Sequence, residues 1–214
     1  MSETVIAINA RIQAELCEET VQALSDTSMA DEYAAIASVR KALAVLGRIL
    51  THNSVDADRI ERIKADYAAH IVPPGTKGVL RGNKFNRLVQ NRIDEMKLDA
   101  ARFDVQFEKM AAAHPTEERP DWFIVDKITK KILIGMNQID LWGGGQQLNR
   151  GTKYLIGNVA HNTANCRLMC VVCRLVVVRS EKNKAFKLFK TGFENGTLCY
   201  LGALHDRIIE YFEL

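Results

Sequence analysis

The sequence lacks any long apolar run. No window approaches the roughly 20 uninterrupted apolar residues that a membrane-spanning helix needs, so no membrane association is expected. The first residues, Met-Ser-Glu-Thr, contain no basic region leading into an apolar stretch, so no secretory signal is expected either. The sequence therefore predicts an intracellular (cytoplasmic) protein whose five cysteines are thiols.

Internal repeats and low-complexity tracts are also missing, which leaves a globular protein. A chain of 214 residues suits one domain, or one core with a helical extension. The net charge is only +3 but is unevenly spread: residues 1–70 hold seven Arg/Lys and eleven Asp/Glu, whereas 120–190 hold twelve and four. A basic second half is expected of a protein that faces phosphates. A solvated basic face without a nucleic-acid role would give the same charge.

The N-terminal third has helical spacing of apolar residues. Val5, Ile8, Ile12 and Leu16 form one set, and a second helix runs from an N-cap at Ser28 to Leu50, with a third after Ser54. Pro73-Pro74-Gly75 interrupts this pattern. We therefore expect a helical region at 1–72 and an α/β core at 73–214. The apolar helix faces fit either internal packing or the dimer interface of an interaction protein.

The second part alternates helical and strand patterns. We expect a long helix at 83–112, a strand hairpin formed by 122–125 and 131–139, a helix at 146–156, a buried strand at 166–178, strands at 185–190 and 198–201, and a closing helix at 205–212. His114-Pro115 should end the long helix.

The most informative motif is Pro120-Asp121 at the start of the hairpin. Together with the apolar strand Ile132-Leu133-Ile134 and the polar residues after it, this motif resembles the PD-(D/E)xK nucleases, in particular type II restriction endonucleases. The resemblance covers about half of the chain. It implies a mixed sheet flanked by helices, and a metal-dependent endonuclease that uses Mg²⁺ to cleave double-stranded DNA. A homodimer is expected because two active sites are needed to cut both strands.

The resemblance also implies the site residues. Asp121 takes the position of the first metal ligand, while Gly135 and Asn137 stand where the family has an acid and a lysine. Either a bulge at Gly135 brings Gln138 and Asp140 round to the metal, or a carboxylate comes from Asp94 or Glu95 on the preceding helix. Asp121, Asn137, Gln138 and Lys153 are thus the candidate catalytic residues, and Asp121, Gln138 and Asp140 the candidate ligands. The alternative is a catalytically inactive DNA-binding protein on the same fold.

The stretch after the second hairpin strand is the candidate DNA-contacting segment. Gly143, Gly144 and Gly145 would let backbone approach DNA, while polar side chains offer donors to phosphates and base edges. The candidate contacts, including two from the basic run at 75–92, are Lys84, Arg87, Gln147, Asn149, Arg150 and Lys153. A simple loop and a solvated helix face would have the same composition.

His161 and three cysteines raise the question of zinc. If 166–178 is a strand, Cys166 and Cys170 share one face and Cys173 lies on the other, so the three cannot converge on one ion. Buried inert thiols are therefore favoured over a zinc site.

Overall fold

The structure is a computed structural model that describes residues 14, 18–25, 27–109, 118–141, 146–175 and 184–214. Its contacts divide the chain into two compact units, one formed by Val21–Lys84 and the other by Met1–Thr20 with Phe85–Leu214. Helix α5 (Pro74–Asp94) contributes residues to both. Within the described ranges, no helix has the length and apolar character needed to cross a membrane. Whether the predicted regions 1–72 and 73–214 are separate domains stays a prediction.

The Val21–Lys84 unit consists of helices. It contains η1 (Thr27–Met29), α2 (Ala30–Ala35), α3 (Ala37–His52), α4 (Ala57–Ile71) and the first part of α5. The helix expected to run unbroken from Ser28 to Leu50 is divided at Ile36, whose extended backbone ends α2 and begins α3. Helix α4 follows Ser54, as predicted, and begins after Asp56, whose carboxylate accepts the Arg59 N–H. Met29, Tyr33, Val39, Leu43, Ala68 and Val72 form its small core.

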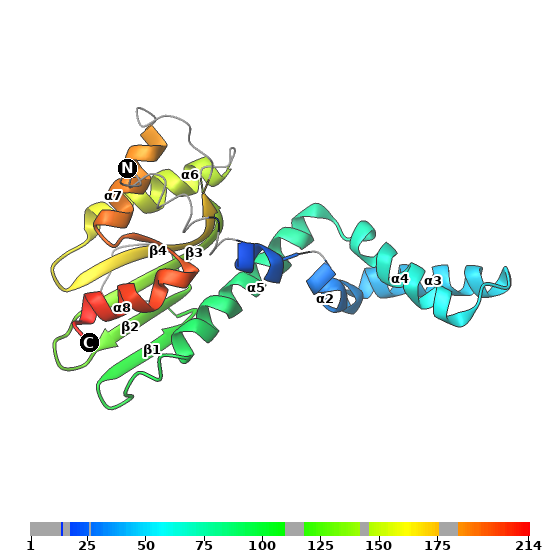
Figure 1. Ribbon diagram of the computed structural model, residues 1–214, viewed down its shortest axis with the longest axis horizontal. Coiled ribbons are helices and arrows are strands. Elements are labelled where there is room, and N and C mark those ends of the chain that lie inside the picture. The colour runs from blue at the N-terminus through cyan, green and yellow to red at the C-terminus, as the bar shows by residue number, and fades with distance from the viewer. Residues whose placement is uncertain (1–13, 15–17, 26, 110–117, 142–145, 176–183) are drawn as a thin grey trace, which may run out of the picture. The chain divides into compact units, whose positions relative to one another are not determined.

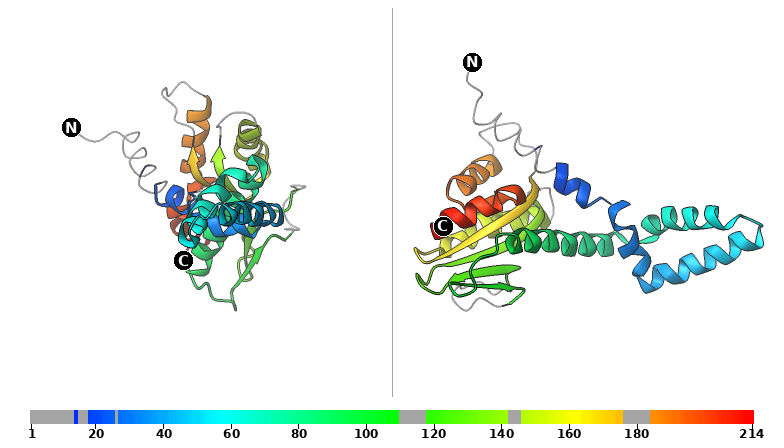
Figure 2. Two further views of the ribbon diagram at one scale, coloured as in Figure 1. Left: turned by 90° about the vertical axis from the view of Figure 1, so that its right-hand side faces the viewer. Right: turned by 60° about the horizontal axis from the view of Figure 1, so that its bottom comes forward.

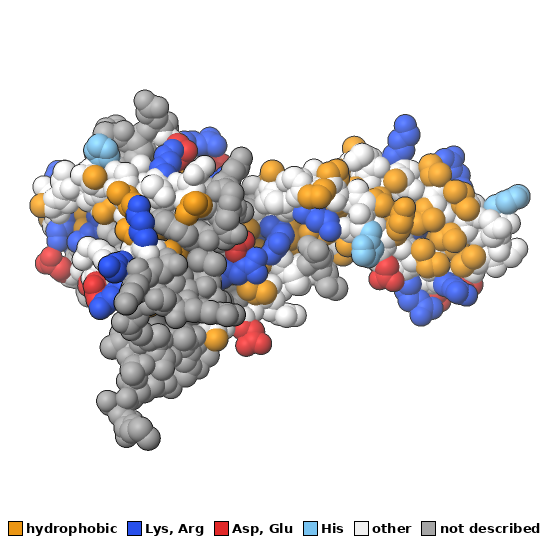
Figure 3. All heavy atoms as spheres, turned by 90° about the horizontal axis from the view of Figure 1, so that it is seen from above, with side chains coloured by type: hydrophobic (Ala, Val, Ile, Leu, Met, Phe, Trp, Pro, Cys, Tyr) orange, Lys and Arg blue, Asp and Glu red, His pale blue; other side chains and the backbone are white. Residues whose placement is uncertain are grey.

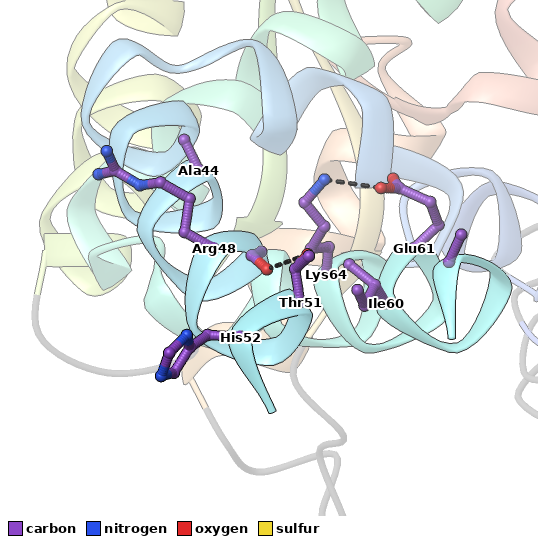
Figure 4. Close-up of a pocket in the computed structure, with 9 residues that line it drawn as sticks. Ala44, Arg48, Thr51, His52, Ile60, Glu61 and Lys64 are labelled. Atoms are coloured by element: carbon purple, nitrogen blue, oxygen red, sulfur yellow. Dashed lines mark hydrogen bonds and ion pairs between the residues drawn. The ribbon is translucent and has the colours of Figure 1, made fainter. Parts of the chain in front are cut away.

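Helices α3 and α4 enclose a shallow groove (Figure 4). Its lining includes Ala44, Arg48 and Ile60. Glu61 and Lys64, which also line the groove, form an ion pair with each other. Val45 and Ile49 on α3 are exposed. In Figure 3 apolar and basic side chains lie side by side on the surface of this unit.

The larger unit is built on one five-stranded sheet in the order β1 (Phe103–Phe107), β2 (Trp122–Asp126), β3 (Ile132–Leu141), β4 (Cys166–Leu175) and β5 (Leu198–Tyr200). The pairs β1–β2 and β2–β3 are antiparallel, whereas β3–β4 and β4–β5 are parallel. Parallel neighbours need crossover connections, and these contain α6 (Gln146–Thr152), the π-helical turn η2 (Lys153–Gly157), η3 (Val159–His161) and then α7 (Lys184–Glu194). The turn η4 (Leu201–Ala203) leads into the closing helix α8 (Leu204–Phe212).

Helices cover both faces of the sheet (Figures 1 and 2). One face of the sheet packs against η2 and α7 in a single apolar cluster. The cluster includes Phe123, Ile134 and Leu168 from the strands, Tyr154 from η2 and Phe189 from α7. The opposite face holds Trp122, Gly135 and Met169, as the two-residue alternation of strands requires. The predicted class, a mixed sheet flanked by helices with an N-terminal helical region, is confirmed. The order helix, hairpin, helix, strand that the sequence predicts is interrupted by one additional strand, β1, between α5 and the hairpin.

The predicted helix 83–112 is wrong in its second half. Helix α5 ends at Asp94, and Phe103–Phe107 is the edge strand β1. A turn separates the two, with Lys97 at a φ of 50° and the Asp99 carboxylate accepting the Ala101 N–H at 2.9 Å. Apolar residues at 103, 105 and 107 alternate with polar ones, which is the strand period. Met110, expected on the same helix, lies outside the described residues.

The predicted strand 185–190 is also wrong, because this segment belongs to α7. Ala185, Phe189 and Gly192 are its buried residues. Their spacing of four and three places them on one helical face, over the sheet. Lys184, Lys187 and Lys190 are exposed on the other side of the helix.

The β2–β3 hairpin is held by a buried ion pair. Asp126, with 0% of its surface exposed, accepts bonds from the Arg102 guanidinium and from the Ile128 and Thr129 N–H groups. The guanidinium, more than any other group, holds the pKa of Asp126 well below its ordinary value. The stabilisation is therefore complete above a pH of about 4 and is lost as the pH falls toward the folded-state pKa.

We expect Asp126→Asn to lower Tm at pH 7 because Arg102 and two N–H groups lose their charged acceptor. The difference from the unaltered protein should shrink below a pH of about 4, where the carboxyl of the unfolded chain takes up a proton. Thermal unfolding at a series of pH values measures this. Glu194→Gln, in an exposed pair 3.8 Å from Lys190, should leave Tm unchanged. A Tm difference for Asp126→Asn that does not vary with pH would contradict this account.

Candidate active site at Asp121

Asp121 lies immediately before β2, with its backbone fixed between two neighbours. Its N–H donates to the Gly135 carbonyl at 3.1 Å, and its carbonyl accepts the Glu108 N–H at 2.9 Å. One carboxylate oxygen accepts the Asn137 backbone N–H at 2.6 Å, and the other accepts the Asn86 side-chain amide at 3.1 Å. The structure thus brings Asp121 into contact with Asn137 and Asn86, and the catalytic and metal-binding roles of the candidate residues stay a prediction.

Neutral amides surround this carboxylate. The Asn137 side-chain amide donates to the Asn86 carbonyl oxygen at 3.1 Å, and the Trp122 indole N–H donates to the Asn137 carbonyl oxygen at 3.0 Å. Asn86 comes from α5, the helix on which Asp94 or Glu95 was considered as a second carboxylate. Both of these are exposed near its C-terminal end, eight and nine residues further along, and Glu95 pairs with Arg92. The helix therefore presents an amide, not an acid, to Asp121.

Burial raises the pKa of the Asp121 carboxyl above its ordinary value. The hydrogen bonds from Asn137 and Asn86 act in the opposite direction, since they stabilise the charged form. Glu108 adds to the upward shift and Arg119 opposes it. A carboxylate has about four acceptor positions, so two bonds leave places for a metal ion or a water molecule.

Gly135 stands at the position where the resemblance places a second acid, and its surroundings leave no room for a side chain. The pairing of β3 with β2 and with β4 keeps a constant register through Gly135, so the bulge considered from the sequence is absent from this described strand. A Cβ atom at Gly135 would lie 1.7 Å from the Cε2 atom of Trp122. The indole thus fills the space that any side chain at 135 would need.

Gln138 and Asp140, the other two proposed ligands, have different partners. Gln138 follows Asn137 on the strand and so points to the opposite face, where its Oε1 accepts a bond from Arg150 at 3.1 Å. Asp140 forms a two-point ion pair with Arg174 on β4. Among the described residues, no group of three or more His, Cys, Asp or Glu could hold a metal. A metal at Asp121 would therefore depend on one or two carboxylates.

Three residues outside the predicted set, Asn86, Glu118 and Tyr154, contact Asp121 or the predicted Lys153 or lie next to them. Glu118 pairs with Lys153, 2.6 Å from Oε1 to Nζ, and its Oε2 accepts the Tyr154 hydroxyl at 3.3 Å. Burial, with the negative charges of Glu118 and Asp121 among the smaller causes, raises the pKa of Tyr154. Tyr154 thus keeps its proton and donates to Glu118, while the negative charge of Asp121 also acts on it. The only sequence signal for Glu118 was its place just before Arg119-Pro120-Asp121, and Asn86 had none.

The remaining predicted DNA contacts fall in different places. Asn149 and Arg150 are exposed on α6, and Arg87 is exposed on α5 directly after Asn86. The Lys84 ammonium donates to the Ser28 carbonyl and hydroxyl within the helical unit. The side chain of Gln147 and the glycines 143–145 lie outside the described residues.

The cysteine-rich strand has the predicted faces. Cys166 and Cys170 belong to the apolar cluster under α7, while Cys173 is on the alternate face of β4. All three are buried thiols outside any disulfide. Burial raises the pKa of Cys170, and it raises that of Cys199, on the neighbouring strand β5, to about 12. Such thiols resist ionisation and are poor nucleophiles and ligands. His161 is exposed. That the protein binds no zinc stays a prediction.

Neither a protein-family model nor a curated protein matches the chain. Solved structures similar to it include Can2 from Sulfobacillus thermosulfidooxidans in complex with cyclic tetra-adenylate, at a TM-score of 0.45 and 9% identity, covering 87% of this chain and 54% of that chain. Protein VC1899 from Vibrio cholerae gives a TM-score of 0.39 and 13% identity, covering 90% of this chain and 54% of that chain. This chain therefore spans about half the length of both.

Proposed function

We propose that the protein is a metal-dependent endonuclease that cleaves double-stranded DNA as a type II restriction enzyme does, with Mg²⁺ bound at Asp121. The supporting observation is the position of Asp121, which lies at the start of β2 beside β3 and has acceptor positions left open. An acid, a lysine and a neutral hydroxyl, those of Glu118, Lys153 and Tyr154, lie nearby. Magnesium commonly takes one or two protein carboxylates and completes its shell with water and phosphate oxygens.

The groups around Asp121 and on the neighbouring helical segment are assigned roles in this proposal. The bound ion would supply a water molecule of lowered pKa and a positive charge beside the scissile phosphate. Asn137 and Asn86 orient the Asp121 carboxylate through their hydrogen bonds. Lys153 places a positive charge, and Tyr154 a neutral donor, where a phosphate oxygen gains charge. Arg150 and Asn149 on the exposed face of α6 are assigned to the DNA backbone.

The second candidate is a DNA-binding protein without catalytic activity. The observation that favours it is the Trp122–Gly135 contact, which removes the family's second acid, together with Asn137 in place of the lysine. On this alternative the amides around Asp121 serve only to satisfy a partly buried carboxylate.

Incubation of plasmid DNA with the protein separates the two candidates. We expect Mg²⁺ to produce discrete fragments from a long duplex, because a two-fold dimer cuts both strands at fixed sites. A parallel reaction with EDTA should leave the DNA intact, and gel filtration should give the mass of a dimer. Uncut DNA in Mg²⁺ and in Mn²⁺, despite binding that weakens as salt rises, would overturn the enzyme in favour of the silent binder.

A further inference from the structure

The Glu118 carboxylate bridges two donors of different kinds. Its Oε1 lies 2.6 Å from the Lys153 ammonium, and its Oε2 accepts the Tyr154 hydroxyl at 3.3 Å. The two donors are consecutive residues at the start of η2. A carboxylate held by a cation and a hydroxyl makes the contacts that two oxygens of a phosphate group would make in the same place.

The donors are arranged to receive such a group from outside. The Tyr154 ring is buried in the apolar cluster, which fixes the position of its hydroxyl, and its raised pKa keeps the proton on that hydroxyl. The Lys153 and Glu118 side chains are 43% and 44% exposed, so solvent reaches the ion pair. Arg150 lies three and four residues earlier on the same helical segment, and its charge acts on Tyr154.

We infer that Lys153 and Tyr154 form a phosphate-binding subsite that Glu118 occupies when nucleic acid is absent, so that Glu118 competes with a DNA phosphate for both donors. The inference rests on the nucleic-acid binding in the proposed function and adds an internal competitor to it. An exposed ion pair contributes little to stability because water screens it. Breaking the Glu118–Lys153 ion pair therefore costs little folding energy, and we expect its effect to fall on DNA affinity rather than on folding.

The test is equilibrium binding of a labelled DNA duplex, with EDTA present so that no cleavage occurs. Glu118→Gln keeps the shape of the side chain and removes its charge. We expect this variant to bind about tenfold more tightly at low salt, and the slope of log affinity against log salt to steepen by about one phosphate contact. Adding Lys153→Met should remove both changes.

Glu213→Gln is the matched control. Glu213 also lies 2.6 Å from a lysine, Lys131, and this change alters the net charge by the same amount. The Glu213–Lys131 pair is a suitable control because Lys131 directly precedes β3, whereas Asn137 of the candidate site lies further along that strand. A general effect of charge would strengthen binding equally in both variants, and this would overturn the subsite.

The other outcomes distinguish the inference from the nuclease proposal. Equal duplex affinity of Glu118→Gln and the unaltered protein would overturn the subsite while leaving Mg²⁺-dependent cleavage to be judged separately. A gain in duplex affinity that Glu118→Gln shows, that Glu213→Gln does not show and that Lys153→Met removes would support the subsite, even in a protein that cuts no DNA. Failure of every variant to bind the duplex at low salt would overturn the subsite and both candidate functions.

Discussion

Asp121→Asn is expected to slow Mg²⁺-dependent DNA cleavage at least about a hundredfold, because a neutral amide is a far weaker ligand for Mg²⁺ than a carboxylate. The substitution keeps the size of the side chain. Because burial already disfavours the charged form of Asp121, loss of its charge does not by itself lower the free energy of unfolding. One of the two donors, Asn137 N–H or the Asn86 amide, loses its acceptor, which lowers the free energy of unfolding by about 1 kcal/mol. Initial cleavage rates and thermal unfolding measure the two effects.

Asp140→Asn is the control for this prediction. Asp140 is an acid on β3 whose carboxylate pairs with Arg174 instead of facing Asp121. We expect less than about a threefold change in rate, since an exposed ion pair contributes little. An inactive Asp140→Asn variant beside an active Asp121→Asn variant would place the metal at the far end of the strand. Equal, full activity of both would remove metal catalysis from this sheet edge.

The order of elements in the core could be predicted because its strongest signals are local. The apolar strand at 166–175, the hairpin around Asp126 and the closing helix each contain their own period and turn residues. The edge strand β1 was missed because its apolar residues continue the helical spacing of α5, and only the turn at Lys97 and Asp99 separates them. Helix α7 was missed because a short apolar run with interspersed lysines fits a strand and a helix equally.

The site could be predicted only where it is close in sequence to the motif. The contact between Asp121 and Asn137 could be predicted because Asp121 directly precedes one strand of the hairpin and Asn137 lies on the other. Asn86 is 35 residues before Asp121. The apolar period of α5 indicates which side of the helix is buried, but it does not indicate that the polar Asn86 beside that face meets Asp121. The ion pair between Glu118 and Lys153 likewise depends on tertiary structure, because Lys153 lies in the crossover connection between β3 and β4. Such long-range contacts follow from tertiary packing, which the period of the sequence does not specify.

Gly135→Ala is expected to have the largest effect on stability, lowering the free energy of unfolding by about 3 kcal/mol. The added methyl would lie 1.7 Å from the Trp122 ring. Trp122 is fully buried, and its indole N–H is held by Asn137 at 3.0 Å, so the ring has no free direction in which to move. Tm should fall by roughly 6 to 12 °C in a protein of this size. Denaturant unfolding followed by tryptophan fluorescence and circular dichroism measures both quantities.

Gly78→Ala and a double variant make this prediction specific. Gly78 lies in α5 with no atom within 4 Å of an added Cβ, so alanine there should raise stability by up to about 1 kcal/mol through helix propensity. Trp122→Ala removes the ring that the methyl meets, although it costs stability by leaving a cavity. In that background Gly135→Ala should lose most of its cost, which gives a large coupling energy between the two positions. An undiminished cost would show that the backbone at 135, and not the indole above it, excludes a side chain from this position.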